Sequence, residues 1–183
     1  MDDIKYIEKY KKQVTKDINK LDSNLIDEIA DLIATKIAVG NSFFIAGNGG
    51  SNATAIHFRE DIMSLRNIFK VKAYSLSETP TITAIANDFD YSEIFKMQLE
   101  NLMDQGDVFI GISCSGKSPN IVKAMEYARR KGETIAITGF DGGEIAKIAN
   151  NVIHIKNKSF EQLEDIHLVI CHILALCVRE KLR

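Results

Sequence analysis

The sequence has no tryptophan, only two prolines and only three cysteines in 183 residues. Proline breaks the interior of a helix, and a chain with only two prolines can therefore form long uninterrupted helices. An odd number of cysteines in apolar surroundings indicates reduced thiols in a cytosolic compartment, rather than a disulfide-stapled secreted domain. No apolar run approaches the roughly 20 residues that a membrane span requires, and the first residues do not resemble a signal peptide.

Neither sign of charge dominates the chain, since 23 basic and 25 acidic residues leave a net charge of −2. No basic footprint therefore points to nucleic acid or to an anionic membrane as a partner. Hydrophobic residues make up 45% and charged residues 26% of the sequence, as in ordinary globular proteins. Composition thus excludes the secreted, fibrous, membrane and disordered classes, and we expect residues 1–183 to form a single cytoplasmic domain.

The first forty residues carry apolar side chains at helical spacing, with charged residues on the other face. Residues 22–24 (DSN) are typical of a helix cap, so the pattern predicts two helices, at about 3–21 and 24–39. Two amphipathic helices before any strand must pack on the domain that follows or on another subunit. We therefore expect residues 1–40 to contribute to a homo-oligomer.

From residue 42 onward, short apolar runs alternate with helical patterns. Strands are predicted at 42–46, 71–75, 107–112, 134–138 and 151–155. Helices are predicted at 52–64, 79–87, 91–103, 118–131, 142–149 and 160–181. Nearly continuous apolar strands alternating with helices predict an α/β fold, a doubly wound five-stranded parallel sheet covered by helices on both faces.

Three predicted strands end in turns rich in Gly, Ser and Thr: Gly47–Ser51, Ser113–Ser118 and Thr138–Gly143. In doubly wound sheets, ligands bind outside the carboxyl ends of the strands. Glycines let the backbone approach a ligand, and hydroxyls beside free N–H groups favour a phosphate monoester. A glycine-rich turn is also often only a turn, but the three serines in the second turn favour phosphate binding there. Neither a dinucleotide fingerprint nor a P-loop is present.

Ionisable side chains recur at helical spacing on two predicted helices. His57 is followed by Glu60 and Asp61, which can share a face with its imidazole. Glu164 and His172 lie eight residues apart on the terminal helix, which places them on one face. Because much of that helix is apolar, we expect His172 to be buried and to need a partner. A lone buried histidine is more often structural, but two histidines with carboxylates from separate helices favour a functional cluster.

Several motifs in one order make the chain resemble a known family over nearly its whole length. The motifs are GNGGS (47–51), His57-Phe58, Asn87-Asp88-Phe89, GISCSG (111–116), TGFDGG (138–143), EDIH (164–167) and His172. Together they resemble a sugar-isomerase (SIS) domain of the phosphoheptose isomerase type. The resemblance implies isomerisation of sedoheptulose 7-phosphate to D-glycero-D-manno-heptose 7-phosphate. It also implies a homotetramer with active sites between subunits, and a divalent metal, most often Zn²⁺.

The resemblance also implies roles for individual residues. Substrate and phosphate binding fall on Asn48, Gly49, Gly50, Ser51, Asp88, Ser113, Cys114, Ser115 and Ser118. The metal ligands would be His57, Asp61, Glu164 and His172. Catalysis would use Asp61, Glu60, His172 and Glu164, in a metal-assisted enediol mechanism with Asp61 or Glu60 as base and His172 as acid.

Three positions depart from the family pattern. Asp61 stands in place of a glutamate, Glu164 in place of a glutamine, and Cys114 in place of a threonine. Losing a methylene at the base can misplace a carboxylate by an ångström, which can lower the rate about 10²-fold. These departures leave two alternatives open. One is an isomerase or epimerase of another phosphosugar, and the other is a non-catalytic SIS module that binds a phosphosugar or a replication-initiator protein.

Overall fold

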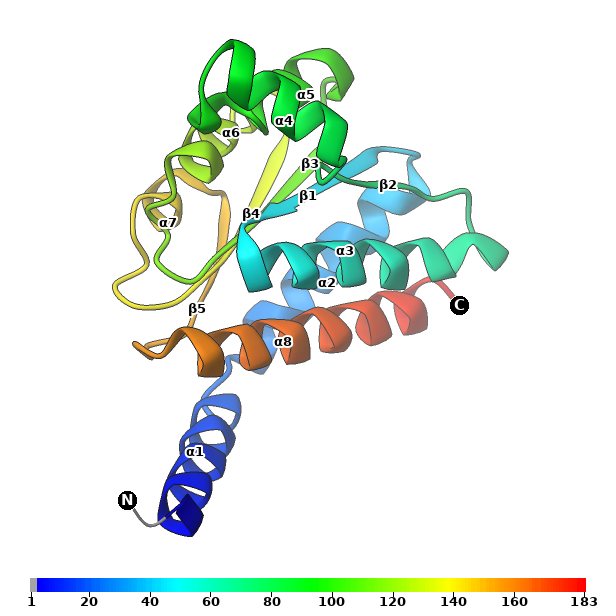
Figure 1. Ribbon diagram of the computed structural model, residues 1–183. Helices are drawn as coiled ribbons and strands as arrows, with labels where there is room; N and C mark the ends of the chain where they lie inside the picture. Colours follow the sequence, from blue (N-terminus) through cyan, green and yellow to red (C-terminus); the bar gives the residue numbers. More distant parts are fainter. Residues whose placement is uncertain (1–2) are drawn as a thin grey trace.

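The N-terminal segment forms two helices, α1 (Asp3–Ile18) and α2 (Ser23–Ala38), in a computed structural model that describes residues 3–183. Asp22 caps α2, because its side chain accepts hydrogen bonds from the backbone N–H groups of Asn24 and Leu25. The two helices confirm the predicted pair, although α1 ends three residues earlier than expected. In Figure 1, α1 projects away from the body of the domain, while α2 lies against it.

The sheet consists of β1 (Ser42–Gly47), β2 (Lys72–Ser75), β3 (Val108–Ser113), β4 (Glu133–Thr138) and β5 (Asn151–His154). All neighbouring strands are parallel and their order is β2-β1-β3-β4-β5. The prediction of a five-stranded parallel sheet is therefore confirmed. The chain adds strands to one side of β1 first and then to its other side, beginning with β3. The turns that follow β1 and β3 therefore lead away from each other and leave a crevice between them.

Side chains alternate along each strand, so each face of the sheet has its own core. Phe43 and Ile45 of β1 lie in a core with α2, α3 (Gly49–Met63) and α8 (Phe160–Lys181). Phe44 and Ala46 face the opposite core. That second core is covered by α4 (Thr79–Asp88), α5 (Lys96–Leu102), α6 (Pro119–Ala128) and α7 (Ile145–Ile148). The molecule is thus a three-layer sandwich with the sheet in the middle.

Helices α3 and α8 lie side by side on the first face and run in the same direction (Figure 1). Helix α3 begins at Gly49, three residues before the expected start at residue 52. The positive φ of Gly49 (54°) lets the chain turn directly from β1 into the helix. The N-termini of both helices therefore lie at the carboxyl edge of the sheet.

Three other predicted helices are shorter in the structure, among them the one expected at 118–131, which is α6. The stretch expected at 91–103 is a 3₁₀ turn, η2 (Tyr91–Glu93), followed by α5, and the helix expected at 142–149 is only α7. The side chain of Asp90 caps η2 by accepting a hydrogen bond from the N–H of Ser92, so η2 begins as an element of its own. Among residues 3–183, no helix combines the length and the apolar character that crossing a membrane requires.

Candidate functional site

A cavity of about 110 Å³ lies where the turn after β1 meets the turn after β3. Its walls are formed by Asn48, Ser51, Ile112, Ser113, Cys114, Ser115, Ser118, Phe160 and Glu164. Six of these residues belong to the set that the sequence assigned to substrate and phosphate binding. The structure therefore brings the first two predicted turns together at the switch point of the sheet.

Hydrogen bonds within the turn hold the serines of the second loop in place. The Ser113 hydroxyl accepts from the N–H of Gly116 at 3.2 Å, and the Ser115 hydroxyl accepts from the N–H of Lys117 at 3.2 Å. Ser118 lies with its hydroxyl 3.5 Å from that of Ser113. Gly116 has a positive φ of 64°, a conformation that glycine adopts without steric cost. The loop is thus a set of preplaced hydroxyls around a small cavity.

The third predicted turn supports this loop. A Cβ at Gly116 would overlap the backbone of Gly142, so the two loops are in close contact. The carbonyl of Gly116 also accepts hydrogen bonds from the N–H groups of Glu144 and Ile145. Among the described residues that line the cavity, none belongs to the turn at 138–143. The glycines of this turn therefore shape the neighbouring loop.

Cys114 places a thiol in the wall of the cavity. The thiol is buried, and its Sγ lies 3.8 Å from the hydroxyl oxygen of Ser51. Burial raises the pKa of Cys114, the hydroxyl of Ser51 opposes this, and the negative charge of Glu164 adds to it. The sulfur is therefore a neutral, weak hydrogen-bond donor at neutral pH.

Glu164 reaches from α8 to the first turn of α3. A Cβ at Gly50 would overlap the Glu164 carboxylate, which therefore lies directly against the backbone of that glycine. Only glycine leaves this space, so Gly50, the last residue of the GNGG run, has a specific steric role here. A carboxylate beside a helix N-terminus is also favoured by the helix dipole.

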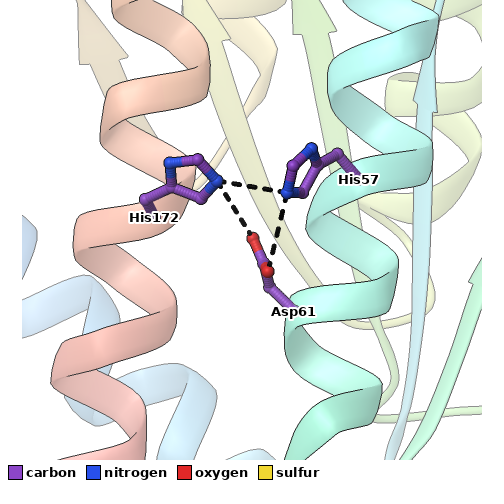
Figure 2. A group of neighbouring side chains, drawn as sticks. All are labelled: His57, Asp61 and His172. Carbon is purple, nitrogen blue, oxygen red and sulfur yellow. Dashed lines mark hydrogen bonds and ion pairs between the residues drawn. The ribbon is translucent and has the colours of Figure 1, made fainter.

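A second group of side chains lies further along the same two helices. Figure 2 shows His57 and Asp61 of α3 facing His172 of α8. The Nε2 atoms of the two imidazoles are 3.2 Å apart. Asp61 Oδ1 lies 3.8 Å from Nε2 of His57, and Asp61 Oδ2 lies 3.7 Å from Nε2 of His172. One potential ligand atom from each residue thus falls within 4.8 Å of the others.

The three side chains fit a divalent metal ion. Asp61 Oδ2 is buried and has no hydrogen-bond partner among residues 3–183, which is costly for a carboxylate oxygen unless a ligand satisfies it. Two imidazole nitrogens and one carboxylate oxygen form a donor set that zinc uses in catalytic sites, with one coordination position left for substrate. The structure therefore offers a possible metal site with His57, Asp61 and His172 as ligands.

Three predicted site residues lie elsewhere. Glu164 is outside the group of three that the described residues form, because it lies at the serine-lined cavity, about two helical turns before His172. Glu60 is paired with Arg59 and borders a surface hollow that His57 also lines, but its carboxylate is not part of the group of three. Asp88 ends α4, where it is exposed and accepts a hydrogen bond from Asn87. Among the described residues, none of these three carboxylates joins the group that His57, Asp61 and His172 form.

The buried histidine of α8 is His167, and the expectation that His172 would be buried is wrong. His167 is 0% exposed, and neither ring nitrogen has a hydrogen-bond partner within residues 3–183. Burial lowers the pKa of His167 to about 4, although the backbone of Thr138 opposes the shift. His167 lies four residues from Leu163 and four from Cys171, so it shares a helix face with these two buried side chains. That spacing was the feature of the sequence that could have predicted the burial of His167.

Two residues near the cavity were not identified from the sequence. Asn120, the second residue of α6, exchanges two hydrogen bonds with Asn48, and the hydroxyl of Tyr91 donates a third to Asn48. An asparagine in the first turn of a helix is common in any protein. Nothing in the sequence around Asn120 therefore indicated that it pairs with Asn48, 72 residues away.

The fold and the site together define an α/β protein of the sugar-isomerase class, with a serine-lined cavity at the switch point of a parallel sheet. The chain belongs to the SIS domain family, whose model matches residues 5–139. It is 36% identical over 182 residues to a phosphoheptose isomerase of Aneurinibacillus thermoaerophilus, covering 93% of this chain and 92% of that relative.

Solved structures of phosphoheptose isomerases have the same fold. The structure from Francisella tularensis superposes with a TM-score of 0.91 at 25% identity, covering 98% of this chain and 100% of that one. The structure from Neisseria gonorrhoeae gives a TM-score of 0.89 at 26% identity, covering 97% and 96%. The likeness therefore includes the N-terminal helices as well as the sheet.

Proposed function

We propose that the protein is a phosphosugar isomerase that converts sedoheptulose 7-phosphate to D-glycero-D-manno-heptose 7-phosphate. The relatives named above support this substrate. The observation that carries the proposal is that one pair of helices bears both halves of a site. The N-terminal ends of α3 and α8 reach the serine-lined cavity, while His57, Asp61 and His172 face one another further along the same helices.

The separation of the two halves suits a long substrate. Ser51 and His57 are six residues apart on α3, or about 9 Å, and Glu164 and His172 are eight apart on α8, or about 12 Å. An extended seven-carbon sugar phosphate has a comparable length. With its phosphate among the serine hydroxyls, the sugar would extend along the helix pair toward the histidines. Glu164, at the cavity, could then accept hydrogen bonds from hydroxyls close to the phosphate.

Aldose–ketose interconversion moves one proton between neighbouring carbons and another between their oxygens. We assign the carbon-bound proton to Asp61, whose Oδ2 lacks a hydrogen-bond partner in the described chain. We assign the oxygen-bound proton to His172, whose Nε2 lies 3.7 Å from that atom. The ion pair of Glu60 with Arg59 outside the group favours Asp61 over Glu60 as the base.

A divalent metal, which we propose to be Zn²⁺, would be held by His57, Asp61 and His172. When bound, such an ion polarises a carbonyl oxygen and stabilises the charge of an enediolate. Asp61 has two carboxylate oxygens, so one can serve as a ligand while the other takes the proton. The Nε2 of His172 cannot hold the ion and carry the oxygen-bound proton at once, so with the ion bound that proton would be carried by a water or a sugar hydroxyl instead. The remaining steps depend on groups of the chain that bind and orient the sugar.

We extend the proposal to a cytoplasmic homotetramer with active sites at subunit contacts. Apolar side chains on the projecting α1 support a contact between copies, since Ile4, Tyr6 and Ile7 are all more than half exposed. Ile56 on α3 and Leu176 on α8 add exposed apolar surface to the helix pair of the site. Light scattering should give four times the mass of one chain, and a stable monomer with full activity would contradict the assembly.

The test is proton exchange during turnover. Sedoheptulose 7-phosphate is incubated with the protein in deuterated water, with metal supplied, beside a panel of other ketose phosphates. We expect deuterium at the carbon that is isomerised and product with the heptose phosphate. If the protein turns over only a different ketose phosphate, that compound is the substrate and the assignment of sedoheptulose 7-phosphate is wrong. Neither exchange nor turnover with any of them would favour a binding module.

Variants separate the proposed roles. Ser115→Ala should raise KM, since it removes a hydroxyl at the cavity, and Ser23→Ala on the exposed start of α2 is its control. Asp61→Asn should lower kcat by about 10²-fold or more, whereas Glu60→Gln should change it little. His57→Ala and His172→Ala should each lower bound metal measured by elemental analysis. Full metal content in both variants would reject this ligand set.

A further inference from the structure

Asn48 occupies the N-cap position of α3, but its side chain does not cap the helix. Its backbone is extended (φ −116°, ψ 149°), and no capping hydrogen bond from its side chain is formed within the described chain. The first N–H groups of any helix have no partner inside the helix. An asparagine at this position usually accepts from one of them and stabilises the helix. Here the carboxamide is engaged elsewhere.

The partner of Asn48 is Asn120, and the two carboxamides form a reciprocal pair. Asn48 Nδ2 donates to Asn120 Oδ1 at 2.9 Å, and Asn120 Nδ2 donates to Asn48 Oδ1 at 2.9 Å. The N–H of Ile121 also donates to Asn120 Oδ1 at 2.9 Å, which fixes which end of that carboxamide carries the oxygen. Asn120 is 1% exposed and is not part of the cavity wall. The side chain of Asn120 therefore reaches the cavity through Asn48, the wall residue with which it exchanges hydrogen bonds.

Tyr91 completes the environment of Asn48. Its hydroxyl donates to Asn48 Oδ1 at 3.1 Å, so the two lone pairs of that oxygen both have donors. The turn that carries Tyr91 is tied to α6 by Lys123, whose ammonium lies 2.6 Å from both the Ser92 hydroxyl and the Glu93 carboxylate. With its acceptor capacity filled, Asn48 Oδ1 is withheld from the N–H groups of α3.

We propose that Asn120 is a positioning residue that keeps the N-terminal end of α3 open for the phosphosugar. By pairing with Asn48, it prevents that side chain from capping the helix, so the N–H groups of the first turn are left to the ligand and to the Glu164 carboxylate, which lies against Gly50. Asn48 and Ser51 both border the cavity, so the open helix end belongs to the site. A self-capped helix would have to break its own hydrogen bond before an anion could bind there. The proposal rests on the function assigned above to this cavity.

The test uses two variants of Asn120 and a double-mutant cycle. Asn120→Ala removes the pair, and Asn120→Asp keeps the volume and the acceptor for Ile121 but sets a carboxylate oxygen against Asn48 Oδ1. Both should raise KM and weaken the inhibition by inorganic phosphate about tenfold, as expected for a lost bond to a charged group. In both, kcat should stay within about twofold. In an Asn48→Ala background, Asn120→Ala should have no further effect on either quantity.

The control is Thr134→Val, at the opposite edge of the sheet. Thr134 is fully buried, and its hydroxyl bonds with Asn150, so this variant also loses a buried polar contact. It should lower Tm without changing KM or phosphate inhibition. Asn120 variants that lower Tm in the same way with KM and phosphate affinity unchanged would overturn the inference. So would additive effects of Asn48→Ala and Asn120→Ala on KM.

Failure of the proposed function is a separate result. If the unaltered protein isomerises no ketose phosphate, the substrate assignment is lost. Binding of inorganic phosphate, measured by calorimetry on the full chain, then still tests Asn120. Tenfold weaker phosphate binding in both Asn120 variants would support the inference, and equal binding would overturn it.

Discussion

The buried His167 predicts a loss of stability in acid that can be calculated from its surroundings. The folded pKa is about 4 and the ordinary value is 6.5. Between these values the unfolded chain binds a proton that the folded chain does not. Stability is therefore complete above pH 6.5, falls as the pH decreases below it, and levels off below about pH 4. At about 1.4 kcal/mol per pH unit, the full effect is about 3 kcal/mol.

Urea unfolding at a fixed protein concentration, repeated from pH 7 to pH 4, measures this dependence. Other groups titrate in the same range, so the informative quantity is the difference between the unaltered protein and His167→Leu. Leucine fills a similar volume and does not titrate. The difference in unfolding free energy should change by about 3 kcal/mol between pH 6.5 and pH 4, with the unaltered protein losing more.

A matched control is His154→Gln. His154 is exposed, and its ring nitrogen lies 3.2 Å from the carbonyl oxygen of Phe140, so this variant keeps the buried histidine. It should retain the acid-dependent loss in full. Parallel stability curves for the unaltered protein and His167→Leu would refute the reasoning, because they would mean that His167 is protonated as readily in the folded chain as in the unfolded one.

Two further predictions concern other contacts of α8. Gly50→Ala places a methyl group where the Glu164 carboxylate lies, so it should lower kcat/KM and reduce the unfolding free energy by about 1–3 kcal/mol. Adding Glu164→Ala should recover the stability, and no recovery would contradict the steric account. Tyr10→Phe should lose less than about 1 kcal/mol, measured by urea unfolding, since the Tyr10 hydroxyl donates to Asp165 at 2.6 Å near the surface. Because Asp165 raises the pKa of Tyr10 to about 12, from 10.0, this stabilising effect should disappear as the pH rises from 10 toward 12. A difference between the two proteins that persists above pH 12 would contradict the role of the hydroxyl.

The local features of the chain were readable from the sequence. The alternation of apolar runs and helical patterns predicted the five-stranded parallel sheet, because strand and helix periods depend only on neighbouring residues. The serine turn at 113–118 was recognisable for the same reason. So was the pairing of His57 with Asp61, because residues four apart always share a helix face.

Tertiary structure decided which of these features meet. Glu164 and His172 share a face of α8, yet the sequence could not show that one lies at the serine cavity and the other at His57, because that depends on how α8 packs beside α3. The burial of His167 and the pairing of Asn48 with Asn120 also depend on contacts between distant elements. Such contacts follow from the packing of whole helix faces on the sheet, and no local spacing encodes them.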